Sequence, residues 1–205
     1  MYSTEQKKLV KHIKTRVKNL FEEHPVKAHN FDHAERVRRW AVIIAKAEKV
    51  NIFLSELSAL LHDIGRVSEH MLGNTKSHHE LSYEWCQQWF REDREFDVLS
   101  KEEKLTILYA LRYHWNDVAD KYTVAWVLRD ADKIDGFGKI GLNRTIECFG
   151  EDPKKLELDL RLRYHCLFEL HTKTARKIVE KKKFFEPIHN YYNRFLKSKI
   201  KPVEL

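Results

Sequence analysis

Residues 52–65 read IFLSELSALLHDIG, an apolar run that ends in a histidine, an aspartate and an isoleucine–glycine pair. Apolar residues recur at three- or four-residue spacing, which predicts a helix from about Asn51 to Gly65. The residues expected to face inward are Leu54, Leu57, Leu60, Leu61 and Ile64. His62 and Asp63 end this helix, where burial of a charge is costly unless a partner offsets it. The pair is therefore a candidate for metal ligation, although a helix-terminal histidine and a capping aspartate would look the same.

The helical period continues along almost the whole chain of 205 residues. Glycine (6) and proline (4) are scarce, which favours long helices with few corners over folds that are rich in turns. Further helices are expected over residues 9–24, 30–48, 79–91, 101–115, 124–135, 140–149, 153–180 and 191–196, with a loop at 66–76. We find no internal repeat and no linker, so we expect one all-α domain over residues 1–205. Its motifs lie in a core of about 25–140, followed by C-terminal helices over about 150–200.

The formal net charge of +7 and the pI near 9.2 fit a partner that carries phosphate, such as a nucleotide, nucleic acid or anionic lipid. Basic clusters occur at residues 181–183 and 197–201, and a solvated helix exterior is the alternative explanation for them. The three cysteines lack CxxC spacing, which indicates a reduced, cytoplasmic setting. The chain has neither an apolar run of about 18 residues nor a signal-peptide block, so no membrane association is expected.

Two further ligand-type residues lie in other predicted helices. His33 falls in the first turn of a helix that begins at Asn30 or Asp32, which are both common N-cap residue types. Asp132 lies inside an apolar helix, two residues after another carboxylate, Asp130. Because buried carboxylates without partners are strongly destabilising, convergence of these side chains on one ion is the simplest explanation. Imidazole and carboxylate together suit a first-row divalent metal.

Three fragments, HNFDHAERV (29–37), LLHDIGR (60–66) and LRDADKID (128–135), resemble in this order the H…HD…D motif of the HD-domain phosphohydrolase superfamily. The resemblance implies a metal-dependent hydrolase built as an HD-type helical bundle with a C-terminal helical extension. It also implies four metal ligands: His33, His62, Asp63 and Asp132. Asp132 fits the family's ADxL-like stretch better than Asp130 does.

Arg66 stands where some members of the superfamily carry a glutamate that is thought to activate water. A guanidinium cannot act as a base, but it can hold phosphate oxygens through two parallel hydrogen bonds. The sequence thus resembles the HDIG[KR] branch of the superfamily. Because a divalent ion lowers the pKa of a bound water to about 7, we expect Asp63 or the hydroxide on the ion to replace the glutamate. The expected catalytic set is Asp63, Arg66 and His29.

Two more histidines resemble extra ligands of superfamily members that hold two metals. The stretch SHHELS aligns His78, rather than His79, with the first of them, and His114 aligns with the next. Those members have an adjacent histidine pair at the second position, whereas here Trp115 follows His114. We therefore expect one firmly bound metal, with His78 and His114 lining the pocket and contacting the substrate.

Arg36 and Lys133 complete the expected substrate contacts. Arg36 matches the arginine of the family's HxxRV stretch, and Lys133 follows a ligand directly. An ion pair for Arg36 and a surface position for Lys133 are the alternatives. His29 precedes His33 by four residues and is expected to contact a ligand or a phosphate, with an ordinary loop position as its alternative.

Small stand-alone HD proteins with these motifs resemble nucleoside triphosphate pyrophosphohydrolases, so the expected reaction converts a (d)NTP to a (d)NMP and pyrophosphate. The expected cofactor is Mn²⁺, with Co²⁺, Mg²⁺, Ni²⁺ or Fe²⁺ as alternatives. Aromatic residues that could stack on the base are Tyr109, Tyr113, Trp115 and Phe137. The alternative functions are a 5′-nucleotidase, a phosphodiesterase, and a nucleic-acid-binding protein that keeps the HD fold. A nucleotide is the expected partner, and a homodimer is left open.

Overall fold

The computed structural model of the chain describes residues 2–69, 76–116, 118 and 120–196. This part of the chain is helical and contains no strand, which confirms the all-α prediction. Its α-helices are α1 Thr4–Glu23, α2 Phe31–Glu48, α3 Ile52–Leu61, α4 Arg66–Glu69, α5 His78–Glu92, α6 Lys101–Tyr113, α7 Thr123–Asp135, α8 Gly138–Phe149, α9 Pro153–Phe168, α10 Lys173–Lys181 and α11 Glu186–Tyr191. A 3₁₀ helix, η1, covers Arg94–Val98, and a π-helical turn, η2, covers Tyr192–Leu196. No helix in the described ranges has the length and apolarity needed to span a bilayer.

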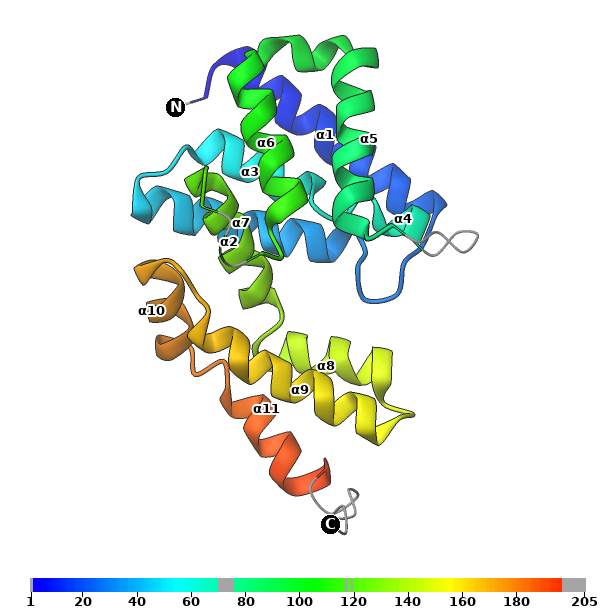
Figure 1. Cartoon of the computed structure of the whole chain (residues 1–205), viewed down its shortest axis with the longest axis vertical. Helices are drawn as coiled ribbons and strands as arrows, with labels where there is room; N and C mark the ends of the chain where they lie inside the picture. Colours follow the sequence, from blue (N-terminus) through cyan, green and yellow to red (C-terminus); the bar gives the residue numbers. More distant parts are fainter. Residues whose placement is uncertain (1, 70–75, 117, 119, 197–205) are drawn as a thin grey trace.

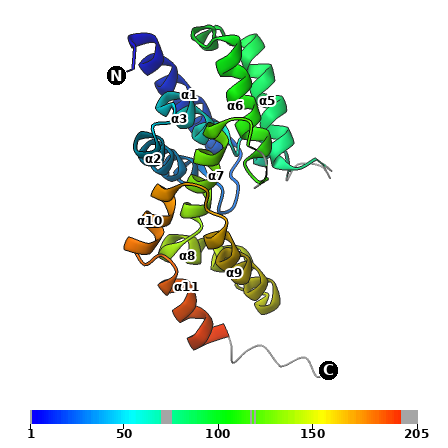
Figure 2. The same ribbon diagram turned by 60° about the vertical axis from the view of Figure 1, so that its left-hand side comes forward.

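Helices α1–α7 form one bundle, and α8, α9 and α11 extend below it (Figure 1). Helix α3 lies in the middle of the bundle, and residues 53–61 are all buried, including the polar Ser55, Glu56 and Ser58. It packs against α1, α2, α6 and α7, while α2 also packs against α7 (Figure 2). The three helices that carry the predicted ligands are therefore direct neighbours in the core.

Local sequence determines where the ligand-bearing helices begin. The Asn30 side chain caps α2 and accepts a hydrogen bond from the backbone N–H of His33 at 3.1 Å. Asn51 caps α3 in the same way. These caps confirm the predicted starts of both helices, and Asn30 rather than Asp32 is the cap of α2. His33 thus occupies the first turn of α2, and His62 directly follows the last residue of α3.

Three predicted segments differ from the structure. The expected loop at 66–76 contains the short helix α4, while residues 70–75 lie outside the described residues. The segment 153–180 is divided into α9 and α10, with the break at residues 169–172. A side chain from another helix causes this break: the Asp130 carboxylate of α7 accepts hydrogen bonds from the Thr172 N–H and hydroxyl at 2.7 and 2.6 Å. Most of the predicted helix 191–196 forms η2, and the basic residues 197–201 lie outside the described part.

Candidate metal centre

Four side chains from α2, α7 and the end of α3 converge in the bundle. The Nε2 atom of His33 lies 3.2 Å from Nε2 of His62, 3.4 Å from Oδ2 of Asp63 and 3.4 Å from Oδ1 of Asp132. His62 Nε2 lies 3.5 Å from the Asp63 oxygen and 3.8 Å from that of Asp132. Ligands about 2.1 Å from one tetrahedral ion are about 3.4 Å apart, so these separations fit a shared divalent metal. The structure therefore brings the four predicted ligands together at a site that can hold one ion.

The opposite ring nitrogens fix how the two imidazoles face this site. Nδ1 of His62 donates to the Ala59 carbonyl oxygen at 2.8 Å, and Nδ1 of His33 donates to Oδ2 of Asp135 at 2.7 Å. Each ring therefore directs its Nε2 toward the site, which is the arrangement that orients histidine ligands in metalloproteins. Both rings are fully buried, so neighbouring side chains also restrict their rotation.

Asp135 is a functional residue that the sequence analysis missed. Its carboxylate is 2% exposed and accepts hydrogen bonds from His33, from Arg36 at 2.7 and 3.1 Å, and from Arg144 at 2.6 Å. Burial alone raises the Asp135 pKa, but the bonds from His33 and Arg36 outweigh this and lower it to about 2. The carboxylate is therefore ionised, and it orients His33 while it neutralises two arginines.

The ligands compete with protons for the same atoms. Burial lowers the His33 pKa, but hydrogen bonds that the ring donates to Asp132, Asp135 and Asp63 outweigh it and raise the pKa to about 10. Burial raises the pKa of Asp63, yet nearby His62, Arg66 and His29 hold it well below its usual range. The site thus collects carboxylate charge around His33 Nε2, and a divalent ion can replace the proton there.

His29 and Arg66 both contact Asp63. Nδ1 of His29 lies 2.7 Å from Oδ2 of Asp63, and Nε of Arg66 donates to that oxygen at 3.3 Å. Arg66 also donates to Glu69 in α4 at 3.1 Å. His29 is held from a second side, because Arg144 donates to the carbonyl oxygen of the preceding residue, Ala28, at 2.8 Å.

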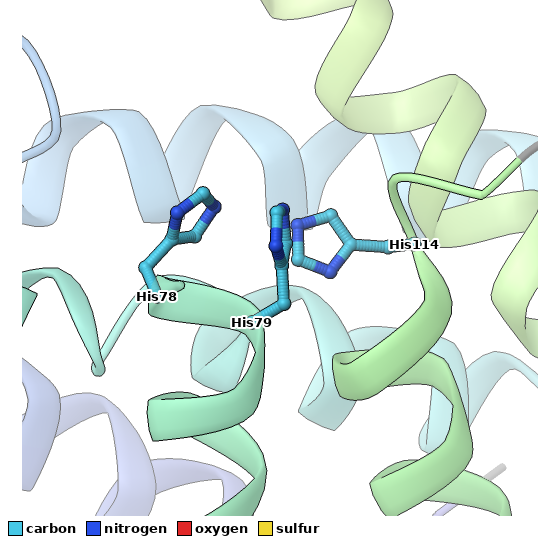
Figure 3. Close-up of side chains that lie close together, drawn as sticks. All are labelled: His78, His79 and His114. Atoms are coloured by element: carbon cyan, nitrogen blue, oxygen red, sulfur yellow. The ribbon is translucent and has the colours of Figure 1, made fainter. Parts of the chain in front are cut away.

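Three histidines form a second cluster beside the first: His78, His79 and His114 (Figure 3). Each offers a ring nitrogen within 4.8 Å of the others, and the His78 Nε2 lies 3.6 Å from Oδ1 of Asp63. Burial lowers their pKa values to about 3, about 2 and about 4, respectively, so all three rings are neutral at pH 7. The sequence analysis did not select His79, because His78 fits the family pattern better.

The environment of His114 repeats that of His62. Each histidine follows the end of a helix, and Nδ1 of His114 donates to the Leu111 carbonyl oxygen at 2.8 Å. The neutral His114 ring therefore presents an Nε2 lone pair, which can bind a cation but cannot donate a hydrogen bond to phosphate. A substrate contact by His114 stays a prediction, and the local geometry favours a ligand role.

The two remaining predicted contacts are held in ion pairs. Arg36 binds Asp135 through two nitrogens, and its side chain is 26% exposed. Lys133 lies 3.2 Å from a carboxylate oxygen of Glu169, which follows α9.

Among the aromatic residues expected to stack on a base, Phe137 is 4% exposed in the core, whereas Trp115 is 58% exposed. The Trp115 ring lies 5.9 Å from that of His79, at the edge of the histidine cluster.

Comparison with solved structures supports the fold. A protein from an uncultured Thermotogales bacterium, described as a predicted HD superfamily hydrolase, is 24% identical and has a TM-score of 0.66, with 93% of this chain and 92% of that chain covered. Bacillus subtilis YpgQ, solved in complex with ADP, is 22% identical with a TM-score of 0.68, covering 98% and 100%. An HD-superfamily hydrolase from Bacillus thuringiensis is 20% identical with a TM-score of 0.64, covering 97% and 100%. No curated protein sequence matches the chain.

The sequence profile of the HD domain family matches residues 30–136, which is more than half of the chain. That range contains all four candidate ligands, in the family's order and gathered at one site. The fold and this donor set support metal-dependent phosphohydrolase chemistry in general. From the profile match and the assembled motif, the chain belongs to the HD domain family.

Proposed function

We propose that this protein hydrolyses nucleoside triphosphates, with ribose or deoxyribose, to the monophosphate and pyrophosphate. The observation that carries the proposal is the convergence of two imidazoles on two carboxylates: the two Nε2 atoms lie 3.2 Å apart, and each lies 3.4–3.8 Å from a carboxylate oxygen of Asp63 and of Asp132. His33, His62, Asp63 and Asp132 would hold one divalent ion, for which manganese is our first choice. When bound, such an ion polarises a phosphate oxygen and makes a coordinated water more acidic.

Arg66 supplies the fixed positive charge nearest to the ligands. Its guanidinium is 22% exposed and is tied to Asp63 and Glu69, so it is oriented before substrate arrives. A phosphate that enters the site can accept hydrogen bonds from the guanidinium nitrogens that face away from these carboxylates. Arg66 would therefore bind charge that develops on the phosphoryl group during the reaction.

His29 is the best-placed proton acceptor in this arrangement. Asp63 is ionised and can only accept hydrogen bonds, so the short contact at 2.7 Å requires a proton on Nδ1 of His29. The other ring nitrogen, Nε2, then carries a lone pair. An imidazole oriented by a carboxylate in this way is a standard general base. His29 thus takes the role that the glutamate has in other branches of the superfamily.

The bond changes follow from these assignments. The water oxygen forms a bond to the α-phosphorus while Nε2 of His29 takes the proton from that water. The bond between the α-phosphorus and the bridging oxygen breaks, and pyrophosphate leaves with the electron pair. Arg144, which binds Asp135 at 2.6 Å, would reduce the charge repulsion of a triphosphate, and Lys133, the residue after Asp132, would assist it.

A nucleoside is the favoured carrier of the phosphates. Trp115 is an exposed aromatic ring beside the histidine cluster, and such a ring can stack on a base. YpgQ, which shares the fold, was solved with ADP bound, so a nucleotide is a sensible first substrate class.

The experiment is a product analysis with purified protein, Mn²⁺ and a panel of dNTPs and NTPs. The proposal requires monophosphate and pyrophosphate in equal amounts, without orthophosphate as a primary product. Orthophosphate release from a triphosphate or a monophosphate would instead support the nucleotidase alternative. The His29→Gln variant should keep its manganese content and lose most of its turnover, whereas loss of metal would assign His29 to binding.

A nucleic-acid-binding role is the second candidate function, and exposed lysines 181–183 favour it. This alternative predicts tight, steeply salt-dependent binding of RNA or DNA that survives both EDTA and the Asp63→Ala substitution. The hydrolase proposal predicts that both treatments abolish turnover. A size measurement on the same samples would test the possible homodimer.

A further inference from the structure

A cavity of about 770 Å³ lies beside the metal centre, between α2, the start of α8 and the residues around α11. Its walls are mostly apolar, and they include Trp40, Ile43, Ile140 and Phe184. Ile43 of α2 and Ile140 of α8 are 48% and 52% exposed, so the cavity presents large apolar side chains to solvent. Its volume lies within the range of pockets that bind small organic molecules.

The walls of the cavity are fixed by specific contacts. The backbone N–H of Gly138 donates to the Phe184 carbonyl oxygen at 2.8 Å, which ties the start of α8 to the turn after α10. Gly138 has a φ of +67°, and a Cβ there would lie 3.1 Å from the Phe184 ring. That ring in turn packs edge-on against Trp40 at 6.0 Å. The cavity is therefore formed by connected elements from both parts of the chain.

Positive charge surrounds this apolar surface. Five lining residues are basic, namely Arg36, Arg39, Lys139, Lys182 and Lys183, and two are acidic, namely Asp135 and Glu186. Asp135 already binds two arginines, and Glu186 pairs with Lys183 at 3.2 Å. Lys139 and Lys182 have no carboxylate partner among residues 2–69, 76–116, 118 and 120–196. The charges of these two lysines are thus available to an anion.

We propose that this cavity binds a small amphiphilic anion, which has an apolar body and one carboxylate or phosphate head. The body would contact the ring of Trp40 and the two isoleucines, and the head would lie between Lys139 and Lys182. Lys182 is already close to the apolar wall, because its Nζ lies 5.9 Å from the ring centres of Trp40 and Phe184. A nucleotide fits less well, since few lining groups other than the charged ones can pair with the polar edge of a base.

This site differs from the proposed nucleotide site but shares one wall with it. Asp135 lines the cavity and also accepts the hydrogen bond from His33. Arg36 lines the cavity too, and it shares that carboxylate. A ligand in the cavity would thus share a wall with Arg36 and Asp135, and Asp135 contacts the metal ligand His33 directly.

The test uses the manganese-loaded full chain and isothermal titration calorimetry. Octanoate and octyl phosphate are the two anionic probes, and octanamide is the neutral analogue of the first. We expect one saturable site for at least one anion, with octanamide binding at least about tenfold more weakly. Equal affinity of octanamide and octanoate, or no saturable binding of either anion, would overturn the proposal.

Exposed lysines provide variants that should leave the fold intact. Lys139→Glu and Lys182→Glu should each weaken binding of the anion by about tenfold or more. Lys181→Glu is the matched control, because Lys181, the last residue of α10, is exposed and directly precedes Lys182 but does not line the cavity. If all three variants lost a similar amount of affinity for the anion, the loss would reflect the net charge of the protein, and the proposed site would be refuted. Displacement of the anion by dATP would likewise refute it, since the cavity would then belong to the nucleotide site.

Discussion

Replacing Asp135 by asparagine changes one oxygen to an NH₂ group and removes a charge without changing the shape of the side chain. In the native protein this buried carboxylate accepts four hydrogen bonds, from His33, Arg36 and Arg144. The amide keeps one acceptor oxygen, so His33 can retain its orientation. Two arginines lose their counter-ion, and the His33 ring loses the negative charge that makes its Nε2 more basic.

Two separate losses are expected from this substitution. Breaking a buried ion pair by removing one partner costs about 3–5 kcal/mol. Because Arg36 is 26% exposed and the amide still accepts a hydrogen bond, we expect about 3 kcal/mol, at the lower end of that range. Removing the partner of a ligating histidine lowers metal affinity by about 10- to 100-fold. We expect about tenfold here, because the ring orientation is kept.

Urea unfolding in EDTA measures the first loss, and calorimetric titration with Mn²⁺ measures the second. Asp159→Asn is the matched control: Asp159 accepts hydrogen bonds from Arg163 at 2.7 Å and Thr145 at 2.9 Å, but it does not contact a ligand. The control should lose stability and keep its manganese affinity. If Asp135→Asn also bound manganese as tightly as the wild type, the proposed support of His33 by Asp135 would be wrong.

Three other substitutions test the remaining assignments. Asp132→Ala removes a ligand, so bound manganese, measured by elemental analysis, and turnover should both be lost; a fully active variant would refute this ligand. Arg66→Lys keeps the charge but loses the two-donor geometry, so kcat/KM for dATP should fall about 10- to 100-fold at unchanged metal content. An unchanged kcat/KM would remove Arg66 from the mechanism. Asp93→Asn should lower the free energy of unfolding at pH 7 by about 2 kcal/mol, because Asp93 accepts hydrogen bonds from His12 and Arg16. Burial alone raises the Asp93 pKa, but the bond from His12, the bond from the Glu95 N–H and the nearby charge of Arg16 outweigh it and lower the pKa in the native state. The contribution is thus complete above the unfolded-state pKa of about 3.9 and disappears as the pH falls through the native value. Urea titrations at pH 7 and pH 3 should show the difference shrinking, and a constant difference would contradict this explanation.

Periodicity predicted the helices well wherever apolar spacing coincides with a packed face. It failed at residues 169–172. Leu156 and Leu160 before the break lie four residues apart, and so do Ala175 and Val179 after it, so the spacing gives no sign that the helix is interrupted. The break depends on Asp130, a residue of α7 that is far away in the sequence. No local pattern carries this information, since the deciding hydrogen bonds exist only in the folded chain.

The three carboxylates of LRDADKID illustrate the same limit within the site. With 3.6 residues per turn, Asp132 and Asp135 lie about 60° apart around α7, whereas Asp130 lies about 160° from Asp132. Asp132 reaches the ligand cluster, Asp135 holds the far nitrogen of His33, and Asp130 anchors Thr172. Motif spacing selected the first of these. The role of Asp135 required the position of α2, because its partners His33 and Arg36 belong to that helix.

Arg144 shows why the C-terminal helices matter to the centre. It lies beyond residue 136, where the HD family match ends, yet it donates to the Ala28 carbonyl oxygen and to Asp135. Ala28 has a φ of +62°, a left-handed conformation that is uncommon for alanine and needs support from its surroundings. Arg144 provides that support, and the next residue along the chain is His29, the proposed base. One arginine outside the motif thus connects the loop that carries the base to the carboxylate that orients a ligand. In the proposed mechanism, the position of the base and the orientation of His33 therefore depend on α8 as well as on the motif residues.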